Sequence, residues 1–156
     1  MEDVMAVAAY VYKRYHEAFG QKIDEMKLHK MLYFAQRESL IQNDQPLFDA
    51  TFYGWKYGPV LKELRNAYRD GNLLSFFKEE VAPDIAEVMD RVFEDYARKD
   101  SWSLSRLSHG ELSWKNSRKG VAPEDTSDIA MELEDIRKDA QRIKNRREML
   151  NSYGLL

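Results

Sequence analysis

The chain has 156 residues, which is enough to bury one hydrophobic core but short for two domains. With 44% hydrophobic and 33% charged residues, its composition is that of a globular protein and excludes an intrinsically disordered chain. The formal net charge of −3 provides no overall positive field for nucleic acid, so binding of DNA or RNA would need a local basic patch.

The chain contains no cysteine, which excludes disulfides, thiolate nucleophiles and cysteine-based zinc sites. Residues 1–19 begin with acids and interrupt their apolar run with Lys13 and Arg14, unlike a signal peptide or a membrane-spanning helix. We therefore expect a cytoplasmic protein that binds no membrane.

Apolar residues at three- and four-residue spacing predict helices over about residues 3–19 and 24–43, the second with Asp24 as its N-cap. Residues favourable to β-structure then crowd together and predict one short extended or β segment near residues 47–55. Because proline suits the first position of a helix, Gly58 and Pro59 predict the start of a third helix, which ends near Gly71.

The second half of the chain is also predicted to be mainly helical. A turn is expected over residues 72–81, and Pro83 predicts the first turn of a core helix that reaches Tyr96. Ser103 is the expected cap of a shorter helix, and apolar residues from Ile129 to Leu150 form the seam of a long last helix. The expected fold is a mainly α, compact single domain of five to six helices.

Histidines are the first candidates for chemistry, since no nucleotide-binding, metalloprotease or hydrolase motif is present. The spacing of His16, His29 and His109 does not suggest a metal or catalytic cluster, and the first two are interpreted as ordinary surface or boundary residues. His109, at a helix exit beside Trp114, leaves two interpretations open: a general base or ligand, or a residue that ties the turn together while Trp114 anchors it.

A basic run over residues 137–147 is the second candidate. Lys138, Arg142 and Arg146 recur at four-residue spacing, a geometry that follows phosphates in nucleic-acid-binding helices. Acidic neighbours weaken the field of this run, so a solvated charged face is the favoured interpretation.

Three sequence blocks in a fixed order resemble one known family. They are MKLHKMLYFAQ (26–36), PLFDATFYGWKYGPV (46–60) and LSHGELSWKNSR (107–118). Together they are similar to the Panacea domain, the SocA-like antitoxin family, whose members have also been labelled phage-associated proteins. On this resemblance, residues 1–120 form a Panacea-like helical domain, and residues 121–156 add a helix packed on the same domain.

The resemblance implies a helical, non-enzymatic protein that needs no cofactor or metal and neutralises a protein toxin encoded beside it. A subsidiary role as an adaptor that hands the toxin to a protease complex is also implied. Residues that match the family pattern, most of them structural in appearance, are Lys27, Leu28, Lys30, Leu32, Tyr33, Phe34, Trp55, Tyr57, Gly58, Pro59, His109 and Trp114. His29 stands where the family usually has Gln, and Ser108 stands where it usually has Thr.

The favoured function is toxin neutralisation, with Trp55, Lys56 and Tyr57 as contact residues, because tryptophan and tyrosine supply much of the binding energy at interfaces. Two alternatives stay open. One is a phage-associated regulator that binds nucleic acid through Lys138, Arg142 and Arg146, and the other is an enzyme built around His109. Whether Trp55 and Tyr57 face the core or a partner is the question that the sequence leaves to the structure.

Overall fold

A computed structural model describes residues 1–155. Within this range it contains seven α-helices, one 3-10 helix and one two-stranded sheet, which confirms a mainly α fold with a short β segment. The elements in chain order are α1 (Val4–Phe19), α2 (Glu25–Asn43), β1 (Tyr53–Trp55), β2 (Gly58–Val60), α3 (Lys62–Asp70), η1 (Leu73–Phe76), α4 (Pro83–Tyr96), α5 (Ser101–His109), α6 (Leu112–Ser117) and α7 (Leu133–Ser152).

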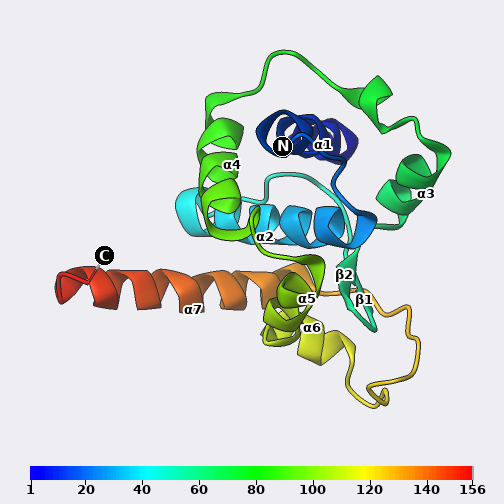
Figure 1. Ribbon diagram of the computed structural model, residues 1–156. Helices are drawn as coiled ribbons and strands as arrows, with labels where there is room; N and C mark the ends of the chain where they lie inside the picture. The colour runs from blue at the N-terminus through cyan, green and yellow to red at the C-terminus, as the bar shows by residue number, and fades with distance from the viewer. Residues whose placement is uncertain (156) are drawn as a thin grey trace.

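Helix α2 is the centre of the fold. Every residue from Lys27 to Ile41 is buried, because the other helices and the β1–β2 hairpin pack on all sides of it (Figure 1). Asp24 caps its start by accepting a hydrogen bond from the Lys27 amide at 2.8 Å, as the sequence predicts. A helix enclosed in this way carries its charged residues into the interior, where they must find partners.

Residues 58–60 differ from the prediction. They form strand β2, antiparallel to β1, and α3 begins only at Lys62. Pro59 lies opposite Gly54 in this hairpin. Gly58 has a φ of 119°, and a residue with this conformation cannot continue into a helix, so the chain makes a tight hairpin before α3 starts.

Two further boundaries were also predicted incorrectly. Asp100, not Ser103, caps α5, because its carboxylate accepts the Ser103 amide hydrogen at 2.9 Å. Ile129 and Leu133 are exposed, and the seam of α7 starts at Ile136.

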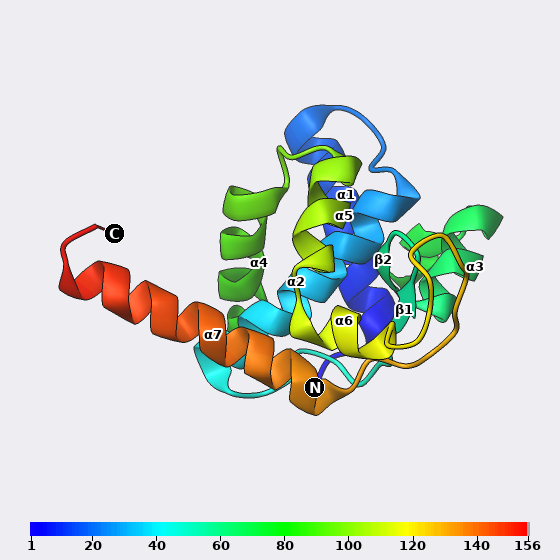
Figure 2. The same ribbon diagram turned by 90° about the horizontal axis from the view of Figure 1, so that it is seen from below.

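Helix α7 packs through its first half on α2 and α6, and its C-terminal end extends beyond the other helices (Figure 2). Ile136 and Ala140 are buried, and after Ala140 no residue of the described chain is fully buried. No helix within residues 1–155 is both long and apolar enough to span a membrane.

Candidate functional site

The backbone of the β1–β2 hairpin is held by side chains from three different helices. Each donates a hydrogen bond to a different carbonyl oxygen of the hairpin. The bonds run from Trp114 Nε1 to Trp55 O (2.8 Å), from Ser105 Oγ to Tyr57 O (2.7 Å) and from Lys30 Nζ to Pro59 O (3.3 Å). The hairpin is thus fixed at the end of β1, in the turn and in the middle of β2, which makes it a rigid platform for the side chains that point outward.

Gly58 is a point of close approach between the hairpin and the helices beneath it. A Cβ at this position would lie 2.5 Å from both Lys30 Cε and Ser108 Oγ. The Ser108 hydroxyl is itself held by a 2.7 Å bond to the carbonyl oxygen of Ser105. Only glycine fits here, both for its positive φ and for the lack of space.

The helical pattern predicted a surface or boundary position for His29, and this prediction is wrong. His29 is buried beneath the hairpin. Its Nδ1 accepts the Leu61 amide hydrogen at 3.1 Å, and its Nε2 lies 3.1 Å from a Glu25 oxygen. An acceptor at Nδ1 requires a neutral ring that donates from Nε2. Burial lowers the pKa of His29, which agrees with this neutral state.

His109 stacks on Trp114, with ring centroids 4.0 Å apart and planes at 13°. Its Nε2 lies 3.5 Å from Ser105 Oγ, the hydroxyl that donates to the hairpin tip. Burial lowers the pKa of His109. Among residues 1–155 no carboxylate forms an ion pair with this ring, and no group of three or more histidines and acids is placed to hold a metal ion. The geometry is that of a support for Trp114 and Ser105.

Tyr57 is exposed at the hairpin tip, with 45% of its surface accessible. Trp102 of α5 is 53% exposed and meets Tyr57 edge to face, with ring centroids 5.3 Å apart. The amine of Lys56 lies over the Tyr57 ring, 5.3 Å from its centre. These three side chains form an aromatic and basic patch, which we call the tip patch.

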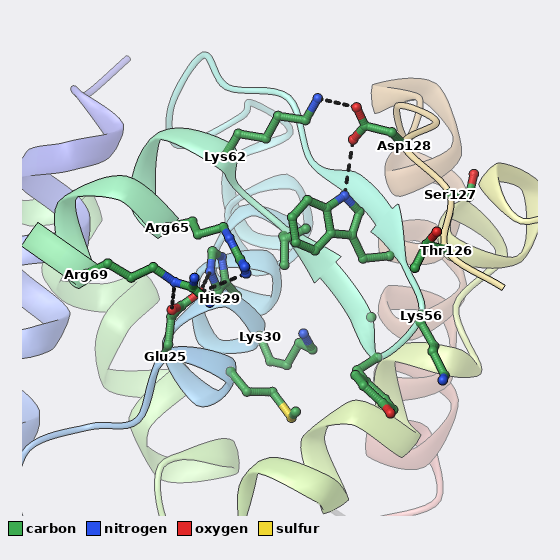
Figure 3. A pocket seen from close by; sticks show the side chains of 15 residues that line it. Glu25, His29, Lys30, Lys56, Lys62, Arg65, Arg69, Thr126, Ser127 and Asp128 are labelled. Carbon is green, nitrogen blue, oxygen red and sulfur yellow. Dashed lines mark hydrogen bonds and ion pairs between the residues drawn. The ribbon is translucent and has the colours of Figure 1, made fainter. Parts of the chain in front are cut away.

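Trp55 is half-buried and lines a pocket of about 800 Å³, which Lys56 and Tyr57 of the tip patch also line. Its indole donates to Asp128 at 3.2 Å, and Asp128 also pairs with Lys62. The Arg65 guanidinium lies 5.1 Å from the Trp55 ring centre. Figure 3 shows Arg65 and Arg69 of α3 on one side of this pocket, Lys56 on another, and Lys30 between them.

The other family-pattern residues lie inside the fold. Leu28, Leu32 and Phe34 are buried core residues, and the Lys27 amine donates to the Tyr15 hydroxyl at 3.1 Å. The Tyr33 hydroxyl lies 2.8 Å from Ser113 Oγ, deep between α2 and α6.

Charged pairs attach α7 to the rest of the protein. Arg147 makes two 2.8 Å bonds to the carboxylate of Glu38, which is almost fully buried. Glu111 pairs with Arg37 inside the fold and with Arg142 at 2.8 Å. Asp139 accepts the amide hydrogens of residues 112 and 113, at 2.8 and 2.9 Å, and so caps α6.

The three basic residues considered for nucleic-acid binding have different surroundings. Arg142 is paired with Glu111, and Lys138 lies 3.8 Å from an Asp135 oxygen in its own helix. Arg146 is exposed on the part of α7 that extends from the fold. The basic run therefore serves partly to dock α7, and Arg146 is the residue of the three without an ion pair among the described residues.

Several residues of this region were not predicted from the sequence, namely Glu25, Arg65, Trp102, Ser105 and Asp128. Asp128 and Trp55 are separated by 73 residues, and Trp102 by 45 residues from Tyr57, so no local spacing joins them. Trp102 alone could have been noticed from the sequence, because it is a large aromatic residue in the first turn of a helix capped by Asp100. Its exposure could not be predicted from the residues around it.

Residues 1–155 thus form a helical domain whose hairpin backbone is fixed by side chains of three helices. Residues 28–115, more than half of the chain, match the family described as "Antitoxin SocA-like, Panacea domain". The chain belongs to this family. The matched region runs from α2 to α6, so it contains the hairpin and its three anchoring side chains. No curated protein and no solved structure matches the chain.

Proposed function

We propose that this protein is an antitoxin that neutralises a cognate protein toxin by direct binding, and that the tip patch is the contact surface. The observation that carries the proposal is the contrast between backbone and side chains at the hairpin. Three hydrogen bonds fix the backbone, while Tyr57 and the adjacent Trp102 are exposed and Lys56 is half-buried beside them. Membership of the antitoxin family supports a protein partner.

The physical reason is the low entropic cost of binding with such a patch. An aromatic side chain on a rigid backbone loses little conformational freedom when a partner covers it, and Tyr and Trp dominate binding hot spots. Lys56 adds a positive charge that would steer an acidic partner surface toward the aromatic pair. Trp55, also expected as a contact, lies at the pocket mouth beside the patch and would contact only a partner that reaches into the pocket.

Co-expression with each neighbouring open reading frame tests the proposal. We expect one product to arrest growth, the wild-type protein to relieve the arrest, and the two proteins to co-purify. Tyr57→Ala and Trp102→Ala should lose neutralisation and co-purification, with a weakening of at least about tenfold. Tyr153→Ala, at an exposed tyrosine near the end of α7, is the matched control and should neutralise fully.

Two outcomes would overturn this assignment. If no neighbouring product is toxic or bound, the antitoxin function itself is wrong. If Tyr57→Ala and Trp102→Ala neutralise fully while Tyr153→Ala does not, the antitoxin function stands and the contact surface is α7. We assign no catalytic role to His109, so a folded His109→Asn variant should still neutralise the toxin. Transfer of the toxin to a protease complex would be a later step, seen as toxin degradation that requires this protein.

A nucleic-acid-binding regulator is the second candidate, favoured by the exposed Arg146 of α7, which has no ion pair among the described residues. Phosphate binding by Lys138, Arg142 and Arg146 would make the affinity for DNA fall steeply with added salt. DNA binding that is absent, or independent of salt, excludes this candidate.

A further inference from the structure

The floor of the pocket behind the hairpin carries an unusual group, the amine of Lys30. This residue is 1% exposed, yet it lines the pocket. Its single hydrogen bond within residues 1–155 is the 3.3 Å contact to the Pro59 carbonyl, and no carboxylate forms an ion pair with it. An ammonium has three donors, so a buried lysine with one long bond is left without its full set of partners.

The walls of the pocket are positively charged, in a protein whose net charge is −3. Five cationic side chains line it, and only two carboxylates do. The cations are Lys30, Lys56, Lys62, Arg65 and Arg69, and the carboxylates are Glu25 and Asp128. Asp128 pairs with Lys62, and Glu25 is shared between Arg65 at 3.8 Å and Arg69 at 3.3 Å. The pocket therefore has an excess of three positive charges when Lys30 is protonated.

We propose that this pocket binds a small phosphorylated ligand, with its phosphate at Lys30 and a flat or apolar body along Trp55. A phosphate monoester carries a charge of about −1.5 to −2 at neutral pH and three acceptor oxygens, which matches the excess charge and the free donors better than a single carboxylate does. The volume of about 800 Å³ suits a small molecule. The Trp55 ring and Val60 provide the apolar wall.

The burial of the Lys30 amine also supports an anion site at this residue. It lowers the pKa of Lys30 to about 7, so the amine is partly neutral near neutral pH. An anion beside this amine would favour its protonated form. The pocket shares Lys56 and Tyr57 with the tip patch, whereas Lys30, Trp55 and Arg65 line the pocket alone. The proposed phosphate site at Lys30 is therefore a neighbour of the toxin contact surface and not the same surface.

The three tryptophans provide a direct test by NMR. Only the indole of Trp55 lines the pocket, so the Trp102 and Trp114 indole signals serve as internal references. Phenyl phosphate, benzoate and inorganic phosphate are the probes. We expect phenyl phosphate to shift the Trp55 indole signal in a saturable way, with benzoate and inorganic phosphate binding at least about tenfold more weakly.

Matched variants separate the pocket from general electrostatics. Lys30→Met should weaken phenyl phosphate binding at least about tenfold, because a charged hydrogen bond is lost, and Lys144→Met on α7 should leave binding unchanged. Arg65→Gln, at the partly exposed rim, serves as the second test if Lys30→Met does not fold. No saturable shift of the Trp55 signal with any probe, or equal affinity in wild type and Arg65→Gln, would overturn the proposal. Tighter binding of benzoate than of phenyl phosphate would refute the phosphate class.

Discussion

Replacing Gly58 by alanine tests whether the hairpin is fitted as closely onto α2 and α5 as the structure indicates. The new Cβ would lie 2.5 Å from Lys30 Cε and from Ser108 Oγ. Lys30 is 1% exposed and Ser108 is fully buried, so neither side chain has a route to swing into solvent. A non-glycine residue at a φ of 119° adds backbone strain.

The expected magnitude is the sum of these two effects. Strain at such a φ costs about 1–3 kcal/mol, and an extra methyl group in a filled interior costs another 1–3 kcal/mol or so. We therefore expect Gly58→Ala to lower the free energy of unfolding by about 2–6 kcal/mol. Since a domain of this size has a free energy of unfolding of about 5–15 kcal/mol, a measurable fraction of the variant should still reach the native fold.

Gly71→Ala is the matched control. Gly71 also has a positive φ, 72°, but a Cβ there would meet nothing within 4 Å. Its substitution should cost only the left-handed strain of about 1 kcal/mol. Urea unfolding followed by circular dichroism gives both values. If the two variants lose equal stability, the close approach of the hairpin to Lys30 and Ser108 is refuted.

Three further predictions concern stability. Arg147→Met leaves the carboxylate of Glu38 buried without its cation and should lower the free energy of unfolding in urea by about 2–3 kcal/mol. Arg146→Met, at an exposed position, is the control and should change this free energy by less than about 0.5 kcal/mol. Equal losses in the two variants would refute the docking of α7 through Arg147. Burial lowers the pKa of Lys30 to about 7 from 10.5, so between these values the unfolded chain holds a proton that the folded chain lacks, and stability rises with pH. The free energy of unfolding should increase by about 2 kcal/mol from about pH 7 to about pH 9, and Lys30→Met should remove that increase; a rise that persists in this variant has another cause. Trp114→Phe removes the indole donor to the hairpin and should cost about 1–3 kcal/mol in thermal unfolding, and an unchanged melting temperature would contradict the role of this bond.

The sequence determined those parts of the protein that depend on neighbours along the chain. Asp24 was recognised as an N-cap and Pro83 as a first-turn residue, because capping and proline geometry act within one helical turn. The ordered blocks also gave the family, which the match over residues 28–115 confirms.

Residues 58–60 show where local reasoning failed. Glycine followed by proline is compatible both with the start of a helix and with a tight hairpin. The choice was made by Lys30, Ser105 and Trp114, which bind the hairpin carbonyls from positions 29 to 59 residues away in the chain.

The candidate surfaces were decided by the tertiary structure alone. The sequence grouped Trp55, Lys56 and Tyr57 as one set of contacts, but Trp55 ends strand β1, whereas Lys56 and Tyr57 form the turn of the hairpin. Trp55 is half-buried and bonds to Asp128, while Tyr57 is exposed beside Trp102. The sequence by itself determined the helices and the family, because caps and apolar spacing are local. Only the packed fold decided which aromatics are open to a partner and which cations share one pocket, because those groups are far apart in the chain and meet only when α2, α3 and the hairpin come together.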